Sequence, residues 1–195
     1  MCLVLVLSMS AIFASCDDKA EPAATTAATT TAADTTTAAT TTAATTTAAT
    51  TTTLSAPDGC KLYAEDGIVF AYPEDWTEAS DIISAPNGQK NITVVYEDAT
   101  TMYDGLSADQ FSAMFAPAYE QLGWSMANVT AKVETSNGLS INVYSFETTL
   151  PQPSATMIQT VFIVTIGERT YSITLTENAV DAAIANTIIE TMRAA

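Results

Sequence analysis

The chain has 195 residues with 22 acidic and 6 basic side chains, a formal net charge of −16 at pH 7. Such a charge repels nucleic acid and anionic lipid headgroups, so nucleic-acid binding is excluded. The sequence has no histidine, which removes the commonest general base and excludes Ser-His-Asp and Cys-His mechanisms. Neither a glycine-rich phosphate loop nor a calcium-binding loop of EF-hand spacing is present.

Residues 3–13 form an apolar run, and two small residues separate this run from Cys16. The run has the length of the hydrophobic region of a secretion signal and is too short to span a bilayer as a helix. The alternative is a buried core helix, but the following segment has no large apolar residue to pack against it. We therefore expect residues 1–15 to be a signal peptide that is cleaved between Ser15 and Cys16.

The sequence Phe13-Ala14-Ser15-Cys16 resembles the bacterial lipobox. The resemblance implies that Cys16 is thioether-linked to diacylglycerol and becomes the first residue of a lipoprotein on the extracytoplasmic face of a bacterial membrane. Two acyl chains anchor stably, because each buried CH₂ contributes about 0.8 kcal/mol. The family usually has Leu where Phe13 stands, and no Lys or Arg precedes the apolar run, which a start codon further upstream would explain.

Residues 16–53 are predicted to be a disordered tether of low complexity. The unit Thr-Thr-Thr-Ala-Ala recurs at 35–39, 40–44 and 45–49, and a period of five fits neither helix nor strand. Without large apolar residues, nothing offsets the entropy lost on ordering. As a flexible coil, this segment would separate its ends by roughly 30–40 Å, and O-glycosylation would extend it.

Residues 54–195 are predicted to form one domain, with 18 acidic and 5 basic side chains and hence a net charge of −13. Turn residues separate β-rich runs at 60–63, 68–72, 81–84 and 91–96, and Asn87-Gly88 predicts a hairpin between the last two. Alternation in the 91–96 run places Ile92, Val94 and Tyr96 on one face.

A helix is expected after Ser107, which forms a capping box with Gln110, and it should end at Gly123. Its apolar stripe packs inward, and Pro117 predicts either a kink or two short helices. Long strands follow at 129–134 and 139–146, joined through Asn137-Gly138, with one buried face that includes Val129, Ala131 and Val133.

The strand at 157–166 is apolar on both faces and is expected inside the sheet, and the strand at 171–176 should bury its odd-numbered residues. A last helix is expected to be capped by Asn178, with an inward stripe of Val180, Ile184, Ile188 and Met192. The fold class predicted from these elements is α+β, with a mainly antiparallel sheet covered by both helices.

The segment Phe70-Ala71-Tyr72-Pro73-Glu74-Asp75-Trp76, the Asn137-Gly138 hairpin and the closing strand at 171–174 with its helix resemble a known family. This αβα sandwich is shared by PsbP, the extrinsic photosystem II subunit, by the Ran-interacting Mog protein of yeast, and by bacterial lipoproteins of the DcrB and LpqN types. The resemblance covers about residues 60–195. It implies a domain that binds proteins or stabilises assemblies, mostly without known catalysis.

Two groups of side chains are candidates for a site. Tyr96, Tyr103 and Trp124 lie near the ends of the first helix and could line a groove for a sugar or peptide, or else pack as core aromatics. Carboxylates recur in adjacent pairs, which are typical of turns but also leave open weak divalent binding or a glycosidase-like pair. The pairs are Glu65-Asp66, Glu74-Asp75 and Glu97-Asp98, with Asp104 nearby.

The sequence therefore favours a non-enzymatic module that binds another envelope protein and uses no cofactor or metal. The alternatives are a small-ligand receptor built on the aromatic residues and, less favoured, an envelope hydrolase built on the carboxylates. Cys60 would be the sole cysteine left after cleavage and lipidation, and it is either a free thiol or an intermolecular partner.

Overall fold

The computed structural model describes residues 55–151 and 154–195. The predicted signal peptide, Cys16 and the Thr/Ala tether lie outside the described residues. In chain order the elements are β1 (Cys60–Glu65), β2 (Ile68–Pro73), β3 (Thr77–Ala79), β4 (Ile82–Ser84), β5 (Asn91–Asp98), α1 (Ala108–Gln121), β6 (Ser125–Ser136), β7 (Leu139–Pro151), β8 (Ser154–Ile166), β9 (Arg169–Glu177), α2 (Ala182–Thr191) and β10 (Arg193–Ala194).

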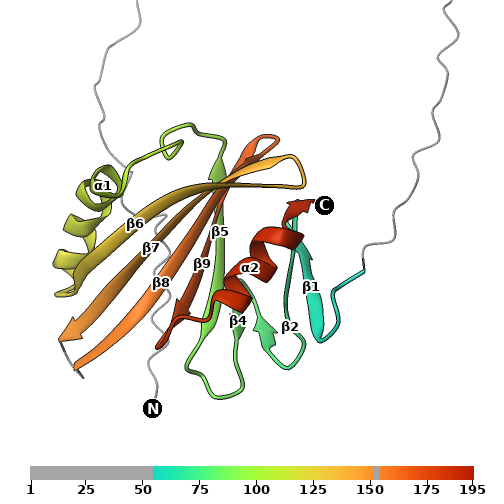
Figure 1. The fold of residues 1–195 in the computed structure, drawn as a ribbon, viewed down its shortest axis with the longest axis horizontal. Helices are drawn as coiled ribbons and strands as arrows, with labels where there is room; N and C mark the ends of the chain where they lie inside the picture. Colours follow the sequence, from blue (N-terminus) through green and yellow to red (C-terminus); the bar gives the residue numbers. More distant parts are fainter. Residues whose placement is uncertain (1–54, 152–153) are drawn as a thin grey trace, which may run out of the picture. The chain divides into compact units, whose positions relative to one another are not determined.

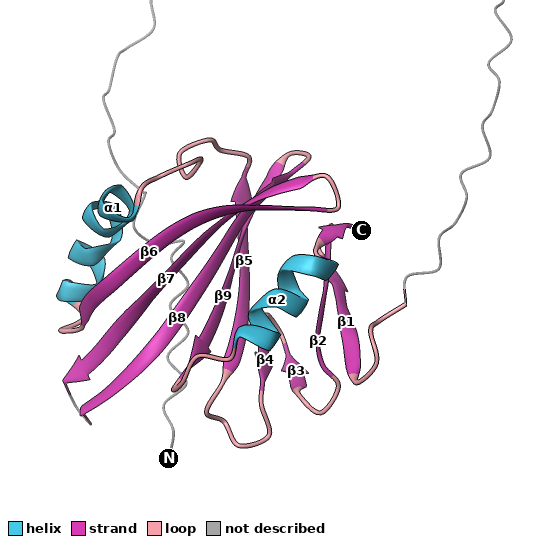
Figure 2. Ribbon diagram, in the orientation of Figure 1, coloured by secondary structure: helices cyan, strands magenta, loops and turns pink. Residues whose placement is uncertain are grey.

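The strands form two antiparallel sheets. The larger has seven strands in the order β3-β4-β5-β9-β8-β7-β6, and the smaller has three in the order β1-β2-β10. Figure 1 shows α1 near the β6 edge of the large sheet, while α2 lies beside the small sheet. Figure 2 shows how long β6, β7 and β8 are in comparison with β3 and β4. The α+β class with a mainly antiparallel sheet is confirmed, whereas the separate small sheet was not predicted.

The two faces of the large sheet carry different cores. The face that packs against α2 and the small sheet holds the larger one, here called the α2-side core, which contains Tyr63, Ile68, Phe70, Tyr72, Trp76, Ile83, Ala85, Ile92, Val94, Ile141, Val143, Phe162, Val164, Tyr171, Ile173, Leu175, Ile188, Ile189 and Met192. The opposite face holds the α1-side core, which contains Tyr103, Phe111, Phe115, Tyr119, Tyr144, Phe146, Val161 and Ile163. Successive side chains of a strand point to opposite faces of the sheet, so neighbouring residues of one strand contribute to different cores.

Helix α1 begins with the predicted capping box, in which Ser107 and Gln110 satisfy each other's backbone N–H groups. It is a single helix, so the alternative of two short helices is wrong. Pro117 is tolerated because it lies on the exposed side of the helix. Proline has no N–H to donate to the carbonyl of Ala113, four residues earlier. Ala113 is also exposed, so its carbonyl can bond to water.

Helix α2 begins three residues later than predicted. Its N-cap is Asp181, whose side chain accepts a hydrogen bond from the backbone N–H of Ala183, and not Asn178. Strand β9 continues to Glu177, so residues 178–180 form the connection, and Val180 is 71% exposed. Val180 therefore does not belong to the inward stripe, which starts at Ile184 and continues through Ile188 and Met192.

The predicted hairpin turns are confirmed. Asn87-Gly88 lies in the turn that connects β4 and β5, and Gly88 donates its N–H to the carbonyl of Ala85 at 2.9 Å. Asn137 and Gly138 both have positive φ, 50° and 78°, which is the geometry of a two-residue turn between β6 and β7. Strand β8 lies inside the large sheet, between β7 and β9, as its apolar composition predicts.

Strand β6 corrects one prediction, because it is the edge of the large sheet and most of its residues are exposed. Val133 was expected on a buried face, but its side chain is 55% exposed. Alternation alone cannot identify an edge strand, since exposure there depends on how far the covering helix extends. Among the described residues, neither helix is long and apolar enough to span a membrane.

Candidate functional site

Two of the three predicted groove aromatics belong to the packing of α1. Tyr103 is 7% exposed and its ring stacks on Phe115 at 6.1 Å between centroids. Trp124 packs against the same cluster and meets Tyr119 edge-on at 6.1 Å. Burial raises the pKa of Tyr103, and the nearby carboxylate of Glu97 raises it further. Both rings therefore stabilise α1 on the sheet.

The third aromatic, Tyr96, lies elsewhere. Its ring is 45% exposed, packs at 6.0 Å from that of Tyr171 in the α2-side core, and is covered by the guanidinium of Arg169 at 4.3 Å. Ile92 and Val94 of the same face are buried, whereas Tyr96 stands at the open end of β5. The structure does not bring the three aromatics together, and it gives the predicted groove no support.

The adjacent carboxylates occupy turns and a strand end, as their turn chemistry predicts. The backbone carbonyl of Asp66, in the β1–β2 turn, accepts hydrogen bonds from the hydroxyl of Tyr171 at 2.6 Å and from Arg169 at 2.7 Å. Within residues 55–151 and 154–195, no three Asp, Glu or Cys side chains are placed to hold a metal ion. The carboxylate of Asp66 itself lies 3.7 Å from the guanidinium of Arg169.

Cys60 starts β1, is half-buried and forms no disulfide. The neighbouring cation, Lys61, donates to the backbone carbonyl of Trp76 and lies 5.2 Å from the ring centroid of Tyr72. Lys61 is thus engaged in packing the β2–β3 turn, and it is not placed as an activator of the thiol.

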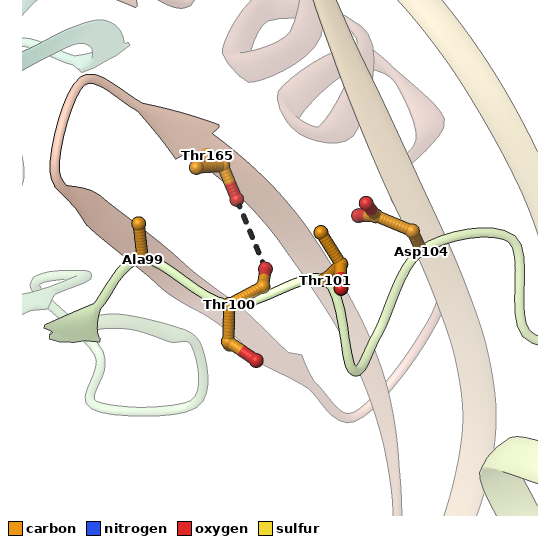
Figure 3. A pocket seen from close by; sticks show the side chains of 5 residues that line it. All are labelled: Ala99, Thr100, Thr101, Asp104 and Thr165. Atoms are coloured by element: carbon orange, nitrogen blue, oxygen red, sulfur yellow. Dashed lines mark hydrogen bonds between the residues drawn. The ribbon is translucent and has the colours of Figure 1, made fainter.

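A shallow pocket of about 410 Å³ lies between the β5–α1 loop and the end of β8, as Figure 3 shows. It is lined by Ala99, Thr100, Thr101, Asp104 and Thr165. The Thr165 hydroxyl donates to the carbonyl of Thr100 at 3.5 Å, and the Thr100 N–H donates to the buried hydroxyl of Thr170 at 2.9 Å. Asp104 is the sole ionisable residue of the lining, so the pocket has no second carboxylate for acid–base catalysis.

A partly buried charge cluster that the sequence did not reveal lies at the start of α2. Glu177 is 2% exposed, and its Oε1 lies 3.2 Å from Nζ of Lys90 without the alignment of a hydrogen bond. Lys90 donates to Asp181 at 2.9 Å, and the N–H of Asp181 donates to the other Glu177 oxygen at 3.2 Å. The hydrogen bond from Lys90 lowers the pKa of Asp181, which burial partly offsets. The cluster links the residue before β5, the end of β9 and the N-cap of α2.

All five cations of the described domain have local partners. Lys90, Lys132 and Arg169 lie within 4 Å of carboxylates, Lys61 donates to a backbone carbonyl, and Arg193 donates to that of Thr191 at 3.0 Å. Most of the 18 carboxylates are exposed and have no cationic partner. The surface that this domain presents is therefore strongly negative, and a basic partner would be attracted to it.

In the described part of the chain, β6 is the longest strand at the edge of a sheet. Pairing with β7 is continuous from Thr130 to Ser136, and a register shift interrupts it between Ala127 and Thr130. Side chains from Thr130 to Val133 are exposed on both faces, while α2 reaches the end of the stretch, where the Ser136 hydroxyl donates to the carbonyl of Glu190 at 3.4 Å. Lys132 and Glu134 form an ion pair of 2.8 Å along the strand, with Val133 between them. The alternating charges were visible in the sequence, but only the sheet order identifies them as edge residues.

No protein-family model and no curated protein matches the chain. Among solved structures, the cyanobacterial PsbP (CyanoP) from Synechocystis sp. PCC 6803 matches at 12% identity with a TM-score of 0.55, covering 70% of this chain and 93% of that one. The domain has a PsbP-like fold. A protein from Bacteroides thetaiotaomicron VPI-5482 matches at 12% identity and a TM-score of 0.46, and the match covers 70% of this chain and 48% of that protein. At such identities, the comparisons establish the fold alone.

Proposed function

We propose that this chain is a lipid-anchored envelope lipoprotein whose PsbP-like domain binds another envelope protein without catalysing a reaction. The anchor is diacylglycerol on Cys16, added when the signal peptide is cleaved after Ser15. The Thr/Ala-rich segment holds the domain away from the extracytoplasmic face of a bacterial membrane. The domain then has the reach to meet a neighbouring protein.

The observation that carries the binding role is the unbalanced negative surface. The domain has a net charge of −13, and each of its cations already has a partner inside the domain. The exposed carboxylates can be matched only from outside, so the partner we infer presents a basic surface. Charge complementarity of this kind speeds encounter and selects partners, and it weakens as salt rises.

The anchor is tested by expressing the full chain and its Cys16→Ser variant in a bacterial host supplied with an alkyne-labelled fatty acid. We expect the label and membrane association in the parent chain, and loss of both in the variant. Cys60→Ser is the matched control, since it removes a cysteine of the folded domain and should leave labelling unchanged. Equal labelling of all three chains would contradict lipidation at Cys16.

Partner binding is tested by capture from the envelope fraction of the native host, with the anchored full chain as bait. We expect one basic envelope protein to be enriched, with a yield that falls between 50 and 300 mM salt. The test variant replaces exposed carboxylates by their amides at Glu74, Asp75, Glu97 and Asp98, which should reduce capture several-fold. Capture that responds neither to salt nor to these substitutions would refute the electrostatic interface.

A further inference from the structure

We propose that the free edge of β6 pairs in antiparallel orientation with the same edge of a second copy of this chain, about a two-fold axis at Val133. The interface is distinct from the negative surface to which a basic partner would bind, and only the high local concentration of the copies rests on the proposed lipid anchor. Three features of β6 carry it: the limits of its regularly paired stretch, the direction of its free backbone groups, and the pattern of its charges.

The regularly paired stretch of the edge has Val133 at its midpoint. A bulge ends regular pairing on one side of Thr130, where Asn128 has a φ of 54°, and the turn at Asn137-Gly138 ends it after Ser136. Between these limits the seven residues 130–136 pair with β7 in one continuous register. The same strand of a second copy can therefore pair regularly only over this stretch, and the two-fold axis of that pairing then passes through Val133.

The backbone groups at Val133 point in the direction that such pairing needs. A two-residue turn closes on a hydrogen-bonded pair, here Ser136 with Leu139, and the antiparallel ladder then alternates. Even-numbered residues of this stretch bond to β7, while Ala131, Val133 and Thr135 direct their N–H and C=O groups outward. In the dimer Val133 donates its N–H to the carbonyl of the partner's Val133 and accepts the reciprocal bond.

The side chains of the stretch are self-complementary in this register. Lys132 lies opposite the partner's Glu134, and Glu134 lies opposite the partner's Lys132. Both residues project on the face of the α2-side core, because they pair with Val143 and Ile141 of β7. The four charges form a square in which every neighbour has the opposite sign. On the other face, the exposed Val133 side chain packs against the partner's Val133.

The charge of the domain makes this edge the favoured contact between copies. Two domains of −13 repel each other over most of their surfaces, whereas the four facing charges sum to zero. The opposite edge of the large sheet is β3, with three residues, so pairing through β6 closes as a dimer and does not extend into a fibre. A single strand pair buries less than the roughly 1,200–2,000 Å² of a standard interface, so we expect weak association, favoured at the high local concentration of a membrane.

The test is disulfide trapping in membranes of cells that express the full chain with Cys60→Ser, to which Val133→Cys is added. A hydrogen-bonded antiparallel pair places the two Cα atoms about 5.5 Å apart, within the range of a disulfide. The matched control is Ala131→Cys, on the same face and edge, whose partner copy would lie four residues along the strand, about 14 Å away. We expect covalent dimer from Val133→Cys at a yield at least about tenfold that of the control.

Charge reversal provides a second readout in the same trapping background. Lys132→Glu places four carboxylates at the interface and should lower the yield about tenfold, whereas Lys132→Glu with Glu134→Lys restores opposite signs and should recover it. Ala64→Glu with Ala79→Glu makes the same change of net charge at exposed positions of β1 and β3, away from β6, and should leave the yield unchanged. Equal trapping at positions 131 and 133, or no recovery in the double reversal, would overturn the two-fold at Val133.

Discussion

The two faces of the large sheet are built on different principles. The α2-side core joins residues of both sheets and α2 around mostly aliphatic strand residues, and it closes over the sheet. In the α1-side core, six of the eight buried residues are aromatic, and one helix covers them. The first face holds the domain together, and neither core contains a residue of the edge stretch 130–136. The residues that stabilise the sheet and the residues that are free to contact another molecule therefore lie in different parts of it.

The α1-side core compensates for its small size with ring packing and hydrogen bonds. Phe111 lies at the centre, with its ring stacked on Tyr144 at 4.1 Å and tilted against Phe115 at 4.5 Å. The Tyr119 hydroxyl donates to Oε1 of Gln159 at 2.7 Å, and burial raises the pKa of that tyrosine. Such aromatic pairs add about 0.5–1.5 kcal/mol each beyond area burial. One helix can therefore be held firmly without a second covering element.

The largest expected effect on the free energy of unfolding comes from replacing isoleucines of two neighbouring strands by alanine. Ile173→Ala opens a cavity in the α2-side core and should cost about 4–5 kcal/mol, because sheet, helix and small sheet all meet there. Ile163→Ala, beneath α1, should cost about 2–3 kcal/mol, since a single helix can settle into the space. Denaturant unfolding of both variants measures the difference. Equal losses would remove the distinction between the two cores.

The next effect concerns the helix that covers the smaller core. Pro117→Ala restores a backbone hydrogen bond on the exposed side of α1 and should stabilise the domain by about 2 kcal/mol. Pro57→Ala, in the turn before β1, is the matched control and should lose about 0.4–1 kcal/mol, since proline there restricts the unfolded chain. Thermal unfolding followed by circular dichroism checks both. No gain from Pro117→Ala would mean that its packing offsets the missing bond.

A smaller effect isolates the polar contact under α1. Tyr119→Phe removes the hydroxyl that donates to Gln159 and should cost about 1 kcal/mol, while the ring contacts stay in place. Tyr96→Phe, whose ring is 45% exposed, should change stability by less than about 0.5 kcal/mol. Urea unfolding at pH 7 distinguishes the two. If both variants behave alike, the buried hydroxyl does not contribute to holding α1.

The smallest effect is a pH dependence at the start of α2. The pKa of Asp181 lies below its ordinary value of 3.8, so the ionised carboxylate stabilises the folded state above that pH, and the contribution disappears as pH falls through the lowered pKa. Asp181→Asn retains a cap acceptor and removes the charge. The parent chain should exceed this variant in stability by less than about 1 kcal/mol from pH 7 to 5, because the carboxylate is partly exposed and screened.

The pH series itself gives the decisive comparison. The gap between the parent chain and Asp181→Asn should close as the pH falls below 3.8 and through the lowered pKa, where the carboxyl becomes protonated in both states. Lys90→Met is the reciprocal control, since without the cation the pKa of Asp181 returns toward its ordinary value. A gap that stays constant down to pH 2 would show that the charge of Asp181 does not stabilise α2.

The sequence by itself determined the elements whose signals are local. Ser107 and Gln110 specify the start of α1, because a capping box involves four consecutive residues, and Asn137-Gly138 specifies a tight turn, because few residues adopt positive φ without strain. The apolar strand at 157–166 was placed inside the sheet for a similar reason, since composition alone requires burial on both faces. The α+β class followed from the order of these elements.

Tertiary structure decided what depends on residues far apart in the chain. Asp181 caps α2 because Lys90, 91 residues earlier, holds it beside Glu177, and no local pattern distinguishes it from Asn178. Tyr103 packs under α1 while Tyr96 lies on the opposite core, since a loop changes face between them. Val133 is exposed because the sheet order makes β6 an edge. Alternation specifies two faces of a strand, but only the packed sheet determines which neighbours cover them.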